Sequence, residues 1–275
     1  MISKSIYLSD DKKARLDVLS MPIYEGQHRE WQNSKRPVAL IVPGGSYLYC
    51  SDRERLPIAF NFLSKGYQVF MLEYHVGDES DYPTPFIDLA KGLKYIKDNA
   101  DEYALDINDI TLVGFSAGGH LAGTFGALAT NKEFQNDMGM TEEELKVHQM
   151  ILAYPAINLK PIVDKINKHQ AFHVVGKLFT TYEMIKDGKA QSHKDMPKAF
   201  VFHSIDDNMV PVADVMDYVT DALSKGCDIE FHLFNRGGHG YSTADLITNP
   251  DDFPTRVGAW MPLAFDWLSE VRQEK

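Results

Sequence analysis

The chain has 275 residues, of which 44% are hydrophobic and 24% are charged, so it is long enough and apolar enough to bury the core of one globular domain. Its 39 acidic residues outnumber its 28 Lys and Arg residues and give a formal net charge of −11 at pH 7. This balance argues against nucleic acid or an anionic membrane surface as a partner, because both are bound through basic patches.

Apolar runs and helix-like segments alternate along most of the chain, as a doubly wound parallel sheet requires. The N-terminal stretch 2–25 alternates weakly and is expected to form edge strands. The further predicted strands are 38–42, 69–74, a run that includes 110–113, 150–154, 199–203 and 229–234, and the predicted helices are 55–65, one that begins after Pro85, 121–128, 212–225 and 255–272. The sequence therefore predicts a single α/β domain over residues 1–275, with a mostly parallel central sheet and helices on both faces.

The segment 157–197 interrupts this alternation. It is long for a simple connection, and it lies between two predicted strands, 150–154 and 199–203. We therefore expect it to form a lid or cap insertion over the active site within the single domain.

The pattern Gly114-Phe115-Ser116-Ala117-Gly118 stands between a predicted strand and a predicted helix. A strand, a sharp Gly-x-Ser-x-Gly turn and a helix form a nucleophile elbow, in which the serine hydroxyl is held clear of the sheet. The five-residue pattern alone arises by chance in about one chain in ten of this length. Its meaning therefore depends on partner residues elsewhere in the chain.

Candidate partners follow two later strands. Asp207 comes shortly after the strand 199–203, and His239 lies in the glycine-rich segment that follows the strand 229–234. A serine hydroxyl needs an imidazole to take its proton, and the imidazole needs a carboxylate to fix its tautomer. The order Ser116, Asp207, His239 is that of the α/β-hydrolase triad. The adjacent Asp206 is the alternative carboxylate, although the spacing to Val210-Pro211 favours Asp207.

The strand 38–42 runs into the turn Pro43-Gly44-Gly45-Ser46-Tyr47, where backbone N–H groups are unobstructed by side chains. We expect an oxyanion hole here, made by the N–H of Ala117 together with N–H groups of this turn, namely those of Gly45 and Ser46. Arg53 and Glu54 follow the turn. They either steady it by pairing with neighbours or form an exposed helix start.

Several of these segments resemble those of a known family. They are the turn at 43–47 followed by Ser51-Asp52-Arg53-Glu54, the elbow through Gly119-His120, the segment Asp207-Asn208-Met209-Val210-Pro211 and the segment Gly237-Gly238-His239-Gly240. The family is the bacterial α/β-hydrolases of the acetyl-esterase and acetylxylan-esterase kind. These enzymes are related to hormone-sensitive-lipase esterases and to the catalytic domains of prolyl oligopeptidases. Where the family turn reads Pro-Gly-Gly-Gly, Ser46 occupies the third glycine position. If that position requires a positive φ angle, we expect slight strain in the loop.

The resemblance implies a serine esterase for small acyl groups, acetyl above all, with acetylated sugars as one class of substrate. The expected partner is a small-molecule ester, and self-association stays open. No cofactor is expected, and no metal either, because the histidines lack metal-ligand spacing. His120, on the elbow helix, is expected to be a core or supporting residue.

Three other functions remain as alternatives. A prolyl-oligopeptidase-type peptidase usually carries an additional propeller domain, and a long-chain lipase favours a more apolar lid than one with Lys160, Lys165 and Lys168. A non-catalytic ligand-binding relative has no need of Ser116, Asp207 and His239.

Targeting segments and disulfides are not expected. Residues 1–11 lack the apolar core of a signal peptide, and no run reaches the length of a membrane span. Only Cys50 and Cys227 are present, too few for a disulfide framework, so both are expected to be reduced. The sequence therefore predicts a cytoplasmic protein.

Overall fold

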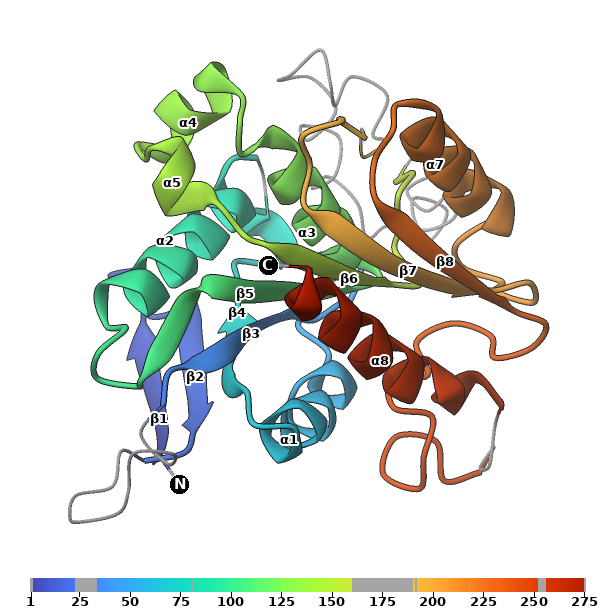
Figure 1. The fold of residues 1–275 in the computed structure, drawn as a ribbon, viewed down its shortest axis with the longest axis horizontal. Coiled ribbons are helices and arrows are strands. Elements are labelled where there is room, and N and C mark those ends of the chain that lie inside the picture. The colour runs from blue at the N-terminus through green and yellow to red at the C-terminus, as the bar shows by residue number, and fades with distance from the viewer. Residues whose placement is uncertain are drawn as a thin grey trace.

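The computed structural model describes residues 2–22, 34–80, 82–159, 190, 192–251 and 256–274. Within these ranges the centre of the fold is an eight-stranded sheet with the order β1-β2-β4-β3-β5-β6-β7-β8 (Figure 1). The strands are β1 (Ile2–Tyr7), β2 (Arg15–Ser20), β3 (Arg36–Val42), β4 (Gln68–Glu73), β5 (Leu105–Phe115), β6 (Gln149–Ala153), β7 (Lys198–Ser204) and β8 (Ile229–Phe234). All pairings from β4 to β8 are parallel, whereas β1 and β2 pair antiparallel with their neighbours.

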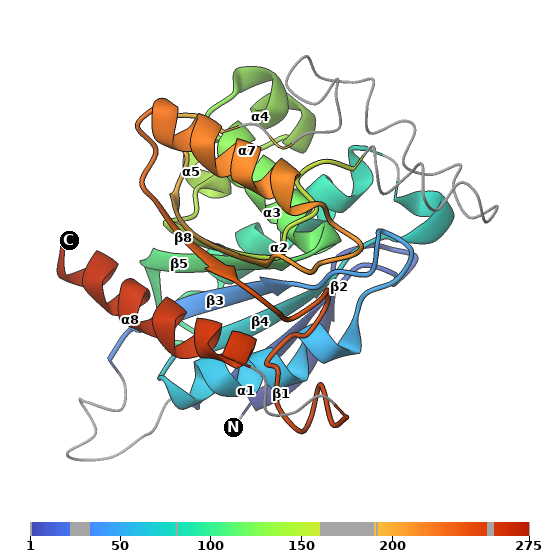
Figure 2. The ribbon, with the colours of Figure 1, turned by 90° about the vertical axis from the view of Figure 1, so that its right-hand side faces the viewer.

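Helices cover both faces of this sheet (Figures 1 and 2). One face carries α1 (Leu56–Ser64) and α8 (Trp260–Gln273), and the other carries α2 (Thr84–Asp98), α3 (Ala117–Leu128) and α7 (Val212–Ser224). Each face has its own cluster of buried apolar side chains, so the core consists of two layers separated by the sheet. This confirms the predicted fold class. In the part of the chain that the structure describes, no helix has the length and apolar character needed to cross a membrane.

The structure differs from the predicted elements in three places. Of the two N-terminal strands only β1 is an edge strand, because β2 lies between β1 and β4. Two short helices, α4 (Lys132–Met138) and α5 (Glu142–Leu145), were not predicted. The closing helix is preceded by a separate 3₁₀ turn, η4 (Arg256–Ala259).

Most of the expected lid, residues 160–189 and 191, lies outside the described residues. The lid and the extent of the single domain therefore stay predictions.

The sheet order reverses at β3 and β5. The chain leaves β3 to form β4 on one side, then crosses back to form β5 on the other side. In open α/β sheets, ligands bind at such a switch point, where the loops after the two strands diverge. Here those loops are the turn after Val42 and the elbow after Phe115.

The elbow is packed too tightly for side chains at two of its glycines. A Cβ atom on Gly114 would lie 2.5 Å from the carbonyl oxygen of Gly118. A Cβ atom on Gly118 would lie 2.1 Å from the carbonyl oxygen of Val42. Glycine is therefore required at both positions by the close approach of α3 to β5 and β3.

Two glycines of α3 provide a matched test of this packing. We expect Gly118→Ala to destabilise the protein by about 3 kcal/mol or more, because backbone must move to admit the methyl group. We expect Gly123→Ala to be neutral or stabilising by up to about 1 kcal/mol, since its Cβ would meet only the Leu152 methyl groups at 3.4 and 3.8 Å. Urea unfolding of both variants measures the difference, and equal stabilities would contradict this account of the elbow.

Candidate active site

The structure brings Ser116, His239 and Asp207 together at the carboxyl end of the sheet. Ser116 lies between β5 and α3, and its Oγ is 2.8 Å from Nε2 of His239. The other ring nitrogen of His239, Nδ1, is 2.7 Å from Oδ2 of Asp207. Because a carboxylate only accepts, Nδ1 carries the proton, which leaves Nε2 free to accept the Ser116 hydroxyl proton.

The Asp207 carboxylate is held by backbone as well as by the histidine. Its Oδ1 accepts the N–H groups of Met209 and Val210, both at 2.8 Å, so that Oδ2 points at His239. The side chain is fully buried. His203, which lies in β7 four residues before Asp207, is also buried. Its Nε2 lies 3.1 Å from the Val210 carbonyl oxygen. Burial lowers the pKa of His203.

Asp206 binds a different turn from Asp207. Its Oδ1 accepts the N–H groups of Gly237 and Gly238 at 2.9 and 2.8 Å, just before His239 in the chain. The two adjacent aspartates therefore have separate contacts: Asp207 with the imidazole, and Asp206 with the loop that carries it.

The turn after β3 lies directly against the elbow. A Cβ atom on Gly44 would come within 2.9 Å of the Ser116 Cβ, and one on Gly45 would come within 1.9 Å of the Tyr49 carbonyl oxygen. Gly45 has φ +122°, Ser46 +57° and Tyr47 +61°. The expected strain at Ser46 is therefore confirmed, because a residue other than glycine adopts a left-handed conformation there at a cost of about 1–2 kcal/mol.

The N–H groups of this turn are not equivalent. The Gly44 N–H donates to Oε2 of Glu54 at 2.7 Å, so it is already engaged. Gly45 and Ser46 therefore stay the candidate oxyanion donors of this turn. Ala117 is the first residue of α3, where backbone N–H groups have no partner within the helix and the helix dipole favours negative charge.

Two residues outside the predicted triad contact the site: Glu54, for which the first of the two sequence-based alternatives, pairing with the turn, is the one observed, and Tyr154, which sequence reasoning missed. Glu54 is only 3% exposed, and its Oε1 accepts the Tyr154 hydroxyl at 2.7 Å. Tyr154 follows β6, and its ring lies edge-on to the His239 ring at 5.2 Å between centroids. The only sequence signal was position, since Tyr154 ends an apolar strand next to the elbow strand.

His120 contacts the turn after β3 through Tyr47. Its Nδ1 lies 2.9 Å from the Tyr47 hydroxyl, and both side chains are buried. Burial lowers the pKa of His120 to about 3, so the ring is neutral and shares one hydrogen bond with the Tyr47 hydroxyl. This agrees with the expectation of a supporting role.

One group of described residues has metal-ligand geometry. Ligand atoms of Asp11, His75 and Glu79 lie within 4.8 Å of one another. Both ring nitrogens of His75 are already engaged, with Asp88 at 2.8 Å and Asp11 at 3.0 Å, and Glu79 pairs with Lys13. Ion pairs account for this group without a metal.

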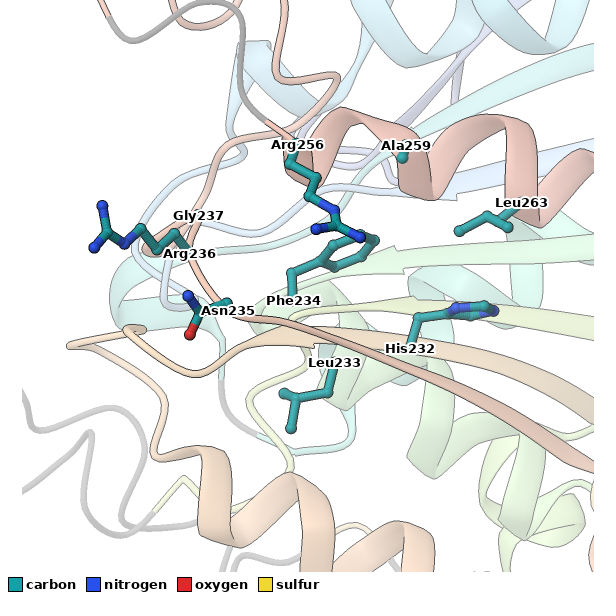
Figure 3. Close-up of a pocket in the computed structure, with 9 residues that line it drawn as sticks. All are labelled: His232, Leu233, Phe234, Asn235, Arg236, Gly237, Arg256, Ala259 and Leu263. Carbon is teal, nitrogen blue, oxygen red and sulfur yellow. The ribbon is translucent and has the colours of Figure 1, made fainter.

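A cavity of about 690 Å³ lies beside β8 rather than at Ser116 (Figure 3). In Figure 3, Arg256 points toward Phe234, whereas Arg236 points away from it. The cavity is lined by His232, Leu233, Phe234, Asn235, Arg236, Gly237, Arg256, Ala259 and Leu263. It therefore follows the outer strand and the start of α8, and it does not include the Ser116–His239 contact.

Named esterases are among the known proteins that this chain resembles. The chain is 26% identical to an acetylxylan esterase of Xylanibacter ruminicola over 269 residues, which cover 94% of this chain and 50% of that protein. The chain spans half or less of the length of the first curated relatives it matches.

Solved structures of similar length match along nearly the whole chain. The carboxylesterase Cest-2923 from Lactobacillus plantarum WCFS1 has a TM-score of 0.85 and 26% identity, with 98% of each chain covered. MGS-M1, an α/β-hydrolase enzyme from a Medee basin deep-sea metagenome library, has a TM-score of 0.77 and 30% identity, with the same coverage.

The family model BD-FAE matches residues 21–220, which is most of the chain and includes the elbow and Asp207. The resemblance inferred from the motifs is thereby confirmed, and the chain belongs to the BD-FAE family of α/β-hydrolases.

Proposed function

We propose that this protein is a serine esterase that hydrolyses short-chain carboxylic esters, acetyl esters above all. The observation that carries the proposal is the continuous contact from Ser116 Oγ through His239 to Asp207, with distances of 2.8 and 2.7 Å. Relatives named carboxylesterase and acetylxylan esterase support the same reaction class.

In the first half of the reaction, Ser116 Oγ attacks the ester carbonyl carbon while His239 Nε2 takes its proton. Negative charge develops on the carbonyl oxygen, where the N–H groups of Ala117, Gly45 and Ser46 stabilise it. The imidazolium is stabilised by Asp207. Collapse of the tetrahedral intermediate breaks the bond to the alcohol, which leaves with the proton from His239.

In the second half, His239 removes a proton from water, which attacks the acyl-Ser116 ester. A second tetrahedral intermediate collapses, the acid is released and the proton returns to Oγ. Every step uses groups of this chain, and no redox change occurs.

The alcohol part of the substrate follows from the named relatives and from charge. An acetylxylan esterase among the relatives makes acetylated sugars the leading candidate, and a formal net charge of −11 favours neutral over anionic substrates. A peptidase and a lipase remain the alternatives because they share the same three residues.

The first test identifies the nucleophile. A fluorophosphonate probe should label wild-type protein at Ser116, and Ser116→Ala should lose labelling and nearly all hydrolysis of p-nitrophenyl acetate. Thermal unfolding of both proteins shows whether the variant is folded. Labelling that persists in a folded Ser116→Ala protein would move the nucleophile elsewhere.

The second test addresses the acyl chain. The segment 157–197 carries several lysines and no long apolar run, which favours a small acyl pocket. Each methylene group left outside a pocket forgoes about 0.8 kcal/mol of transfer free energy. We expect kcat/KM for p-nitrophenyl esters to fall from acetate and propionate to near background at octanoate.

Two further substrates separate the alternatives. Acetylated xylo-oligosaccharides test the sugar-ester reading, and a prolyl peptide substrate tests the peptidase. A maximum at decanoate or longer chains would instead identify a lipase.

The third test separates the two aspartates. In Asp207→Asn the amide oxygen stays with the N–H groups of Met209 and Val210, so the NH₂ group faces Nδ1 of His239 and imposes the wrong tautomer. We expect kcat to fall on the order of 10⁴-fold, as tautomer loss does in serine proteases.

The matched variant is Asp206→Asn. Its amide oxygen can still accept both glycine N–H groups, so we expect less than about a tenfold loss. Steady-state kinetics on p-nitrophenyl acetate measure both values. The reverse ranking would assign the catalytic carboxylate to Asp206.

A further inference from the structure

Glu54 is a buried carboxylate placed beneath the turn that borders Ser116. It ends the 3₁₀ turn η1 (Asp52–Glu54), and its side chain reaches back to the preceding loop. Oε2 accepts the Gly44 N–H, and Oε1 accepts the Tyr154 hydroxyl, both at 2.7 Å. Among the described residues no Lys or Arg forms an ion pair with it.

Tyr154 extends this contact to the loop that carries His239. Its hydroxyl oxygen accepts the Ser242 N–H at 3.1 Å, and its ring contacts the His239 ring edge-on, with an interplanar angle of 67°. The Ser242 hydroxyl in turn donates to the carbonyl oxygen of Arg53, next to Glu54. The loops after β3, β6 and β8 are therefore joined through one carboxylate and one phenol.

An ionised carboxylate satisfies this arrangement. The Gly44 N–H can only donate, and the proton of the buried Tyr154 hydroxyl, whose oxygen accepts from Ser242, finds its acceptor in Glu54. A carboxylate offers an acceptor oxygen to each, whereas an amide or a protonated acid offers one oxygen acceptor and places a donor against the second group.

Keeping such a charge buried is costly. Burial raises the pKa of Glu54, and the hydrogen bonds from Tyr154 and Gly44 oppose that rise. An ion in this environment costs several kcal/mol of desolvation unless its hydrogen bonds compensate. An apolar side chain in this space would leave the Gly44 N–H and the Tyr154 hydroxyl without an acceptor, so Glu54 is placed for its hydrogen bonds and not for packing alone.

We propose that Glu54 is a positioning residue for ester hydrolysis. Its carboxylate orients the Gly44-Gly45 turn and, through Tyr154, the imidazole of His239, so that the oxyanion donors and the base keep one arrangement. The inference rests on the proposed function, because it assigns Glu54 to the same reaction. Glu54 itself touches neither substrate nor reacting atoms.

The variants Glu54→Gln, Tyr154→Phe and the double variant test this link. The glutamine can satisfy only one of the two donors, and the phenylalanine keeps the ring beside His239 but removes the hydroxyl. We expect each single variant to lower kcat for p-nitrophenyl acetate about 10- to 100-fold, with KM within about twofold, because the affected groups act in the transition state. We expect the double variant to be no worse than the poorer single variant.

Asp109→Asn is the control for loss of a buried carboxylate. Asp109 is 6% exposed, lies near the start of β5 and contacts Gln149 and Arg272, at the opposite end of the sheet from Ser116. We expect this variant to lower the melting temperature while leaving kcat and KM unchanged. A purely structural role of Glu54 would give the same result as this control.

The rate of fluorophosphonate labelling of Ser116 provides a second readout that needs no ester substrate. We expect it to fall in Glu54→Gln and Tyr154→Phe in proportion to kcat. If wild type is labelled but hydrolyses no ester, the proposed function fails while these labelling rates still decide the role of Glu54. If Glu54→Gln does not fold, Tyr154→Phe decides it alone. Rates within twofold of wild type in a folded variant, or fully additive losses in the double variant, would overturn the inference.

Discussion

The backbone of Ser116 is held in a conformation that few residues with side chains adopt, and the rest of the site depends on it. Its φ and ψ angles are +50° and −115°. Such a conformation costs about 1–3 kcal/mol and persists only where the surroundings enforce it. Here the Ser116 N–H donates to Ala153, and its carbonyl oxygen accepts from His120 and Ala156. The end of β6 and the first turn of α3 thus hold the serine in place.

Because the elbow stands at the carboxyl edge of the sheet, its partners come from the ends of the neighbouring strands. The parallel register aligns those ends, with Phe115 beside Ala153 and Ser204 beside Phe234. Short loops from β7 and β8 then suffice to bring Asp207 and His239 to Ser116. The arrangement of Ser116, His239 and Asp207 is therefore a consequence of strand register together with three short loops.

Much of this arrangement could be predicted because its signals are local. The elbow glycines, the apolar strands and the order of Ser116, Asp207 and His239 can all be recognised over a few residues each. The strain at Ser46 could also be predicted, because the family pattern places glycine there. The helices α4 and α5 were missed although each has a local cap, since runs of 7 and 4 residues carry little periodicity.

Other features could not be predicted because they depend on distant parts of the chain. Whether β2 lies at the edge of the sheet is decided by its pairing with β4, about 50 residues away, and not by its own alternation. The contact between Glu54 and Tyr154 spans 100 residues, and no local pattern links the two. Sequence alone left Glu54 undecided between an exposed helix start and a partner of the turn, because burial is a property of the assembled fold.

The three carboxylates around the site differ in how many of their oxygens are used, and this difference determines what each one contributes. Asp206 gathers two N–H donors on a single oxygen, so it can hold its loop without needing a charge. In Asp207 and in Glu54 both carboxylate oxygens accept hydrogen bonds, and the two oxygens accept from different donor groups. An amide imitates one acceptor oxygen but not two. Two acceptor oxygens are therefore used at the two positions that link separate loops, and those are the positions that connect His239 and the turn after β3 to the rest of the fold.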